Sequence, residues 1–565
     1  LRRPAASTGT PRRRELGREP TAKDRWRYRF ESTLARGTWA VIAWLGALTA
    51  AIVVVAGLVI FLLAGGFGPD DDRNLGEGVW QSMLRVMDPG TMAGDRGWGT
   101  RFLALTITIV GLLLASALIG LIATAIDLRI EQLRKGRSFV VEDGHTLILG
   151  WSPRVFTVIS EIQVANENQP GSCITVLAAE DKTVMEDEIR ERVPAHKATH
   201  VVCRTGDPAA LSDLAMVNAS RARSVVILGE EGPSGDAEVV KSALAVLAGD
   251  LDPAVPVVAE LNRTDAADAL RDASGGRILT VRSAEVIAKV TAQACREAGL
   301  SAVFQELLDF DGDEIYFHPA PELEGRMFGE ALLAYDSSTI FGRLTAGGEV
   351  QINPPMDTEF GPGDSVITVS EDDDTVVFTG IREVAAPSGA EPVAERGAEH
   401  LLVIGWNSLG PLVLSQLDLF VAPESTVDVL MESAMVDPEL PPPHEPDGHS
   451  YGNLSVSTRQ ARVGVKDLEE AMTAKTYDSV VVLGYRHEVA EAEADARTLL
   501  SLMVIDRVLS RSGQRPRVVA ELLDARDVEL AQVTGGDDFV VSDALGSLMM
   551  AQLSEHAALS GVFVD

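Results

Sequence analysis

Cysteine is scarce in this chain, which has three cysteines among its 565 residues. Cys173, Cys203 and Cys295 are far apart, and their spacing matches neither a metal-ligand motif nor a redox motif. This scarcity also argues against a fold that depends on disulfide bonds. We therefore expect three buried, reduced thiols in a cytoplasmic domain.

Basic residues are few in this acidic chain, but they outnumber acidic residues at the N-terminus. The formal net charge is −34, yet residues 1–36 contain eleven Arg or Lys and four acidic residues, so the rest of the chain carries −41. A body this acidic repels phosphate, which argues against a nucleic-acid partner. Because residues 1–36 precede an apolar stretch, we interpret them as a basic cytoplasmic arm.

Charge is absent from two long stretches, residues 38–64 and residues 102–126. Each is longer than the roughly 20 residues that a helix needs to cross a bilayer. The first is too long and starts too late to be a cleaved signal peptide. We predict transmembrane helices at residues 37–64 and 102–126, and hence a multi-pass protein in a lipid bilayer.

The orientation follows from the basic residues that flank these stretches. They are Arg25, Arg27, Arg29 and Arg36 before the first, and Arg129, Arg134, Lys135 and Arg137 after the second. The positive-inside rule then places both termini in the cytoplasm and residues 65–101 outside. Arg outnumbers Lys by 41 to 8, which suggests a bacterial source and the plasma membrane.

The outer segment has the pattern of a pore loop. An apolar stripe typical of a short amphipathic helix is formed by Val79, Trp80, Met83, Leu84 and Met87. A turn signal follows at once, because proline fixes φ and glycine tolerates a positive φ. We predict a pore helix and then a selectivity filter formed by Asp88, Pro89, Gly90, Thr91, Met92 and Ala93.

Two helices cannot enclose a pore, so the pattern requires an oligomer, and we expect a homotetramer. Four copies would place four Asp88 carboxylates around one axis, where a divalent cation compensates them best. The alternative is that Asp88 is a solvent-facing turn residue and backbone carbonyls select the ion. The potassium-filter sequence Thr-Val-Gly-Tyr-Gly is absent, so potassium selectivity does not follow from the sequence.

The second apolar stretch contains Gly111 and Gly120 among small residues. Glycine can act as a hinge in a gate helix, and small residues permit close helix packing. We propose both glycines as gate-hinge candidates, with ordinary membrane-helix packing as the alternative.

The rest of the chain contains an internal repeat. His-Thr-Leu-Ile-Leu-Gly-Trp at 145–151 recurs as His-Leu-Leu-Val-Ile-Gly-Trp at 400–406, and Val-Val-Ala-Glu-Leu at 257–261 recurs at 518–522. Apolar strands alternating with helices are typical of a doubly wound parallel α/β sheet of the Rossmann type.

The repeat defines the predicted domains of the cytoplasmic part. The ranges are a linker at 127–144, a first Rossmann-like lobe at 145–303, a β-rich lobe at 304–380, a linker at 381–399 and a second Rossmann-like lobe at 400–565. The chain ends where we would expect a second β-rich lobe to begin.

The dinucleotide fingerprint is incomplete in both copies. The first copy keeps Gly150 alone, and the second keeps Gly405 and Gly410 without the middle glycine that lets a pyrophosphate approach the backbone. These glycines are therefore weak cofactor-binding candidates, and nucleotide binding is disfavoured.

A membrane-tethered NAD-dependent oxidoreductase is the rival hypothesis for the whole protein. It is opposed by the incomplete fingerprint and by the lack of a convergent His/Cys/Lys constellation. A regulatory subunit of a separate transporter is a third.

Three segments resemble the Castor/Pollux ion channels, known from plants and bacteria. They are residues 87–93, which are similar to the family's Ala-Asp-Ser-Gly-Asn-His-Ala filter, residues 202–206 and residues 371–375. The resemblance implies tandem regulator-of-potassium-conductance (RCK) domains in an eight-domain gating ring below a tetrameric pore. It also implies conduction of calcium, of potassium or of both, and not an enzyme.

The family resemblance further implies that the ring binds calcium. Candidate ligands are the acidic residues Glu180, Asp181 and Asp207 at predicted strand ends. The acidic run at 309–314 resembles a calcium loop only superficially, and we interpret it as a β-turn. Pro89, Thr91 and Met92 depart from the family filter, which leaves the selected ion open.

Overall fold

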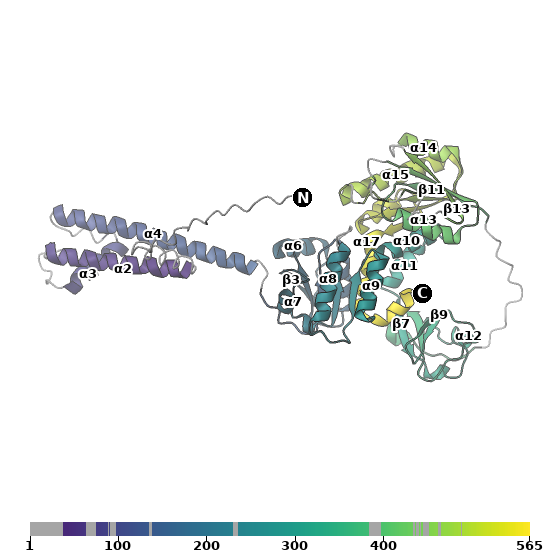
Figure 1. The fold of residues 1–565 in the computed structure, drawn as a ribbon, viewed down its shortest axis with the longest axis horizontal. Coiled ribbons are helices and arrows are strands. Elements are labelled where there is room, and N and C mark those ends of the chain that lie inside the picture. Colours follow the sequence, from purple (N-terminus) through teal and green to yellow (C-terminus); the bar gives the residue numbers. More distant parts are fainter. Residues whose placement is uncertain are drawn as a thin grey trace, which may run out of the picture. The chain divides into compact units, whose positions relative to one another are not determined.

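The computed structural model divides into two compact units, residues 1–134 and residues 135–565 (Figure 1). It describes residues 38–63, 75–88, 90, 98–134, 138–229, 235–382, 397–432, 436, 440, 442–443, 451–460, 465–486 and 489–564. The predicted basic arm at residues 1–36 lies outside the described residues.

The first unit contains three described helices, α2 (Thr38–Leu63), α3 (Leu75–Met87) and α4 (Trp98–Arg134). Within the described residues, one helical segment, Arg101–Thr124 of α4, is long and apolar enough to cross a membrane. The apolar segment of α2, Ala43–Val59, is shorter. The second predicted span thus has the required length and composition, whereas the first span, and with it the two-span pore, stays a prediction.

Helix α3 packs closely against both longer helices because glycine occurs at the contact points. A Cβ atom on Gly57 of α2 would lie 2.7 Å from Cα of Val79, and one on Gly111 of α4 would lie 2.8 Å from Cα of Val86. Any larger side chain at either glycine would force the helices apart. Val86 also packs on the small buried cluster formed by Ala56, Ala104 and Ile107.

The second unit begins with a parallel sheet of six strands in the order β3-β2-β1-β4-β5-β6. Its strands are β1 (Thr146–Leu149), β2 (Ser172–Ala178), β3 (Thr199–Thr205), β4 (Ser224–Ile227), β5 (Val257–Glu260) and β6 (Ile278–Val281). Its helices are α5 (Arg154–Ala165), α6 (Lys182–Arg192), α7 (Leu211–Met216), α8 (Gly235–Ala248), α9 (Thr264–Ser274), α10 (Ser283–Ala294) and α11 (Leu300–Leu308).

The second parallel sheet repeats this topology in the order β13-β12-β11-β14-β15-β16. Its strands are β11 (His400–Ile404), β12 (Ser425–Met431), β13 (Leu454–Gln460), β14 (Ser479–Val482), β15 (Arg517–Leu522) and β16 (Asp538–Val541). Its helices are α13 (Gly410–Phe420), α14 (Val465–Ala474), α15 (Glu491–Ser512), α16 (Val528–Gln532), α17 (Ser542–Glu555) and α18 (Ser560–Val564). The predicted pair of Rossmann-like parallel sheets is confirmed.

A smaller antiparallel sheet lies between the two repeats in the sequence. Its order is β7-β10-β8-β9, formed by β7 (Glu314–Pro319), β8 (Thr339–Leu344), β9 (Val350–Ile352) and β10 (Ser365–Ser370). Phe328 of the short helix α12 (Phe328–Ala331) stacks on Phe360 in its core. Helix α11 continues across residue 304, so the antiparallel sheet starts later than the expected lobe boundary.

The two Rossmann-like lobes exchange helices. Met550 and Leu553 of α17, from the second lobe, join the core that α5 forms on the first sheet. Reciprocally, Ala288 and Ala292 of α10, from the first lobe, join the core that α13 forms on the second sheet. One face of each sheet is therefore covered partly by a helix of the other lobe (Figure 1). The lobes cannot separate without exposing both cores to water.

The prediction that the three thiols are buried and unpaired is confirmed. Burial raises the pKa of Cys173 to about 11 and that of Cys295 to about 12. Thiols that stay protonated are poor nucleophiles and poor metal ligands, so the cysteines serve packing.

Candidate functional site

A turn centred on Asp88 ends helix α3. The Asp88 N–H donates to the Leu84 carbonyl oxygen at 2.7 Å, and the Gly90 N–H donates to Oδ1 of Asp88 at 2.8 Å. The carboxylate thus stabilises the turn that the sequence predicts. Asp88 and Gly90 are both exposed. The other predicted filter residues, Pro89, Thr91, Met92 and Ala93, lie outside the described residues.

The contact between Val86 and Gly111 sets the depth of this turn relative to α4. Gly111 lies about ten residues after the start of the apolar segment Arg101–Thr124, which corresponds to roughly 15 Å along a helix. That distance is about half of a hydrocarbon core of roughly 30 Å. The C-terminal end of α3, with its partial negative charge, therefore lies level with the middle of the apolar segment.

The apolar stripe of α3 mostly faces outward. Trp80, Met83 and Met87 are 53%, 42% and 71% exposed, whereas Ser82 and Arg85 on the opposite side are 0% and 2% exposed. An outward apolar side and a buried polar side reverse the pattern of a water-soluble surface helix. Sequence reasoning did not single out Arg85, although a lone basic residue beside a predicted filter was a usable signal.

The two hinge candidates have different surroundings. Gly111 is the contact point for Val86, so its lack of a side chain is required for helix packing. A Cβ atom on Gly120 would meet nothing within 4 Å. The hinge role of both glycines stays a prediction.

The first glycine of each fingerprint is required by the backbone. Gly150 has φ +101°, and a Cβ atom there would lie 2.5 Å from the Leu228 carbonyl oxygen. In the second repeat Gly405 has φ +87° and would approach the Leu483 carbonyl oxygen to 2.3 Å. Both glycines therefore allow the end of the first strand of each sheet to pass close to the fourth strand. This role needs no nucleotide.

The third fingerprint glycine accommodates a tryptophan. A Cβ atom on Gly410 would lie 2.6 Å from the ring of Trp406, which is 2% exposed and covers the start of α13. The first repeat has Val155 at the equivalent position, and there Trp151 lies half-buried against Phe156 with ring centroids 5.5 Å apart. In the second lobe the Trp406 ring thus packs against Gly410 at the start of α13, and the expectation against a nucleotide stays a prediction.

The calcium candidates lie in the loops that follow β2 and β3, where Asp181 is the N-cap of α6 and Glu180 and Asp207 accept local backbone hydrogen bonds. The N–H groups of Asp181, Thr183 and Ala209 donate to the carboxylates of Glu180, Asp181 and Asp207, respectively, at 2.8–2.9 Å. All three carboxylates are exposed. Among the described residues, no three His, Cys, Asp or Glu side chains are grouped so that they could hold a metal ion. The calcium role of these residues stays a prediction.

A buried glutamate occupies an equivalent place in the fifth strand of each parallel sheet: Glu260 is the last residue of β5, and Glu521 is the last but one of β15. Glu260 accepts a hydrogen bond from the Ser283 hydroxyl at 2.7 Å, and Glu521 accepts one from the Ser542 hydroxyl at 2.7 Å. Each also pairs with a buried arginine, Glu260 with Arg154 at 2.9 Å and Glu521 with Arg486.

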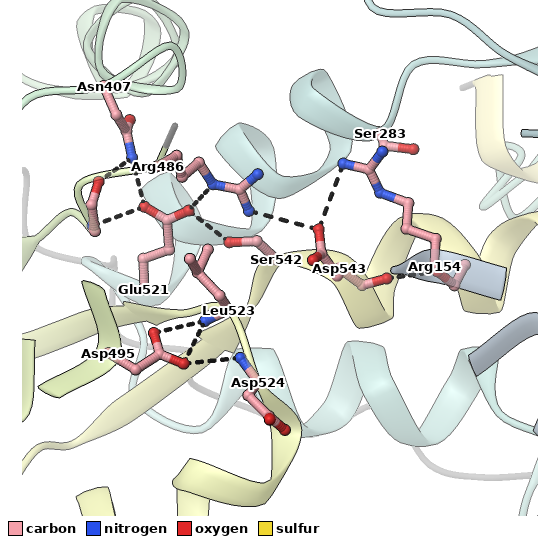
Figure 2. A network of polar contacts seen from close by, with 12 residues as sticks. Arg154, Ser283, Asn407, Arg486, Asp495, Glu521, Leu523, Asp524, Ser542 and Asp543 are labelled. Carbon is pink, nitrogen blue, oxygen red and sulfur yellow. Dashed lines mark hydrogen bonds and ion pairs between the residues drawn. The ribbon is translucent and has the colours of Figure 1, made fainter. Parts of the chain in front are cut away.

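The second glutamate makes further hydrogen bonds. Its Oε2 accepts from Nδ2 of Asn407 at 2.8 Å and from the Gly484 N–H at 3.0 Å (Figure 2). Burial raises the pKa of Glu260, and the Arg154 guanidinium opposes this effect.

Asp543 connects the two arginine–glutamate pairs. Its Oδ1 lies 3.4 Å from Nη2 of Arg154 and 3.8 Å from Nη2 of Arg486 (Figure 2). Arg154 begins α5 in the first lobe, whereas Arg486 and Asp543 belong to the second. Charged groups of both lobes therefore meet at the start of α17, and we call these five charged residues the interlobe network. A cleft of about 400 Å³ next to the network is lined by Trp151, Phe156, Arg192, Arg486 and Asp543.

An acidic cluster lies beside a second cavity of about 350 Å³ between the same lobes. Burial raises the pKa of Glu161 to about 7 and that of Asp309 to about 6, and each carboxylate is further affected by its acidic neighbours. The Phe310 N–H donates to Glu161 at 3.2 Å, and the Asp311 N–H donates to Asp309 at 3.2 Å. Residues 309–312 form a bend between α11 and β7, and the β-turn interpretation of this run stays a prediction.

The raised pKa of Glu161 predicts a pH-dependent stability. The folded protein holds this proton up to about pH 7, whereas the unfolded chain loses it near pH 4.5, so the free energy of unfolding falls as pH rises through that window. We expect Glu161→Gln to raise the melting temperature by about 2–4 °C at pH 8 and to leave it unchanged at pH 4.

Melting curves of the two proteins at pH 4 and pH 8 measure this difference. Glu167→Gln, at an exposed position just after α5, is the control for surface charge alone. An equal melting temperature for Glu161→Gln and the unmodified protein at pH 8 would contradict the prediction.

Comparison with known protein families identifies one domain in this chain. Residues 284–383 match the family model described as "Castor and Pollux, part of voltage-gated ion channel". This range runs from α10 through the antiparallel sheet.

Similar curated proteins extend over most of the chain. The ion channel CASTOR of Lotus japonicus is 28% identical over 556 residues, which cover 91% of this chain and 64% of the relative. The probable ion channel POLLUX of Arabidopsis thaliana is 27% identical over 555 residues, covering 92% of this chain and 66% of the relative. The chain thus spans just under two thirds of the length of these relatives.

One solved structure supports the fold of the paired sheets. The human SLO3 gating ring aligns with a TM-score of 0.51 and 12% identity, covering 74% of this chain and 85% of that chain. The GsuK channel bound to NAD aligns with a TM-score of 0.44 and 16% identity, over 92% of this chain and 84% of that chain. The resemblance inferred from the sequence is confirmed, and the paired sheets have the fold of a gating ring. These relatives are named as ion channels.

Proposed function

We propose that this chain, a relative of the Castor/Pollux ion channels, is one subunit of a homotetrameric cation channel that conducts calcium, potassium or both. The observation that carries the proposal is the position of α3. This short helix ends level with the middle of an apolar helix and is followed directly by the Asp88 turn. A short helix that ends within the bilayer directs its C-terminal partial negative charge at a cation.

Residues 135–565 are the proposed gating unit. Because α10 and α17 are exchanged between the lobes, a ligand that shifts one lobe also moves a helix of the other. Such a ligand must bind one arrangement of the lobes better than the other in order to gate the pore. We propose calcium as this ligand on the basis of the family resemblance, with residues 127–144 as the connection to the pore.

Assembly into a ring is supported by a repeated apolar surface. Leu244 on α8 is 48% exposed, and Leu500 and Met503 on the equivalent helix α15 are 51% and 59% exposed. Exposed apolar side chains at matching places in both lobes are typical of surfaces that meet in an assembly. We propose that the ring forms through these two helices, below a cell membrane with both chain termini in the cytoplasm.

Reconstitution tests the proposal directly. Purified protein in liposomes should give cation currents whose reversal potentials shift when calcium or potassium is exchanged. Absence of current from protein that is tetrameric in detergent would contradict a channel and favour the role of a regulatory subunit.

Assembly has its own test. We expect Leu500→Asp to lower the fraction of tetramer at least about tenfold, because a buried carboxylate opposes an apolar contact. Light scattering after size-exclusion chromatography measures this fraction. Ser512→Asp at the exposed end of the same helix is the control. A tetramer fraction that Leu500→Asp leaves unchanged would remove α15 from the interface.

A further inference from the structure

Arg85 is a buried charge in the segment that we assign to the pore. Its side chain is 2% exposed, and it lies one helical turn before Asp88. The next residue, Val86, contacts Gly111 level with the middle of the apolar segment of α4. The guanidinium group is therefore held within the helix bundle at a depth where lipid surrounds the protein.

The local contacts hold this charge inside the bundle. Nη1 of Arg85 donates to the Gln81 carbonyl oxygen at 3.1 Å and to Oε1 of Gln81 at 3.0 Å. Long basic side chains in membrane helices usually extend to the interface, where water solvates them. Arg85 instead bonds to the preceding turn of its own helix, beside the buried Ser82. Such a costly position marks a residue with a functional role.

We propose that Arg85 is a specificity-determining residue that lowers the permeability of the pore to divalent cations relative to monovalent cations. The inference rests on the proposed channel function. A fixed positive charge repels a divalent ion twice as strongly as a monovalent ion at the same distance. Four copies of Arg85 would offset the four Asp88 carboxylates, so the filter would attract cations without holding divalent ions tightly.

Bi-ionic reversal potentials with calcium on one side and potassium on the other test this role. We expect Arg85→Gln to raise the calcium-to-potassium permeability ratio at least about tenfold, because the repulsion acts on the exponent of the permeability. Arg85→Lys keeps the charge and should leave the ratio within about twofold of the unmodified channel. Arg101→Gln, at the exposed start of the apolar segment, is the matched control for loss of a charge elsewhere.

The outcomes separate this inference from the channel proposal. Absence of current from the unmodified protein overturns both. If the unmodified channel conducts and Arg85→Gln keeps its permeability ratio, the inference fails while the channel stands. The apolar Arg85→Met is a second neutral variant in case glutamine prevents assembly. If both neutral variants fail to assemble while Arg85→Lys assembles, the charge is structural and the inference is overturned.

Discussion

Asp88→Asn is expected to raise the calcium concentration that half-blocks monovalent current at least about tenfold, because four carboxylates at one axis are what binds a divalent cation. Asparagine should keep the turn, since its side-chain oxygen can accept the hydrogen bond that the Gly90 N–H donates at 2.8 Å. The substitution therefore removes the charge with little change in shape. Calcium titrations of single-channel potassium current in bilayers measure the effect.

The interpretation of Asp88→Asn depends on a control for net charge. Asp143→Asn removes one exposed carboxylate from each subunit outside the predicted pore. We expect it to leave the calcium block unchanged. If Asp88→Asn gave the same block as the unmodified channel, Asp88 would be a turn residue alone, and backbone oxygens would select the ion.

Glu521→Ala is expected to lower the free energy of unfolding by about 3–5 kcal/mol, because it leaves a buried arginine without its carboxylate partner. Glu521 is 2% exposed and Arg486 is 7% exposed, so water cannot replace the lost interaction readily. The hydrogen bonds from Ser542 and the Gly484 N–H to the carboxylate would be lost as well. Chemical denaturation of the purified chain, followed by tryptophan fluorescence, measures the free energy of unfolding.

An exposed glutamate is the control for this test, because the same substitution there removes a carboxylate that is not buried. Glu529→Ala, on the exposed side of α16, should change the free energy of unfolding by less than about 0.5 kcal/mol. A loss below about 1 kcal/mol for Glu521→Ala would mean that the ion pair contributes little beyond its desolvation cost.

The interlobe network also offers a physical route for the proposed gating. Asp543 lies between arginines that belong to different lobes, and a cleft of about 400 Å³ opens beside it. Rotation of one lobe against the other would lengthen one of these two ion pairs. Packed interfaces of this kind tend to switch between discrete arrangements rather than to deform continuously.

Much of the architecture follows from the sequence alone. The repeated strand motifs that end in Gly150 and Gly405 predicted two parallel sheets, and both sheets are present with the same strand order. Three scattered cysteines predicted buried thiols, and they are buried. These features depend on local pattern and composition, which the order of residues specifies directly.

Only the tertiary structure decided the contacts between distant segments. Arg154 and Asp543 are almost 400 positions apart, and no local pattern pairs them. The sequence also could not show which side of α3 is buried, because an apolar stripe has the same period whether it faces protein or lipid. The contacts of α3 with Gly57 and Gly111 fix its orientation, and in this orientation Arg85 is buried.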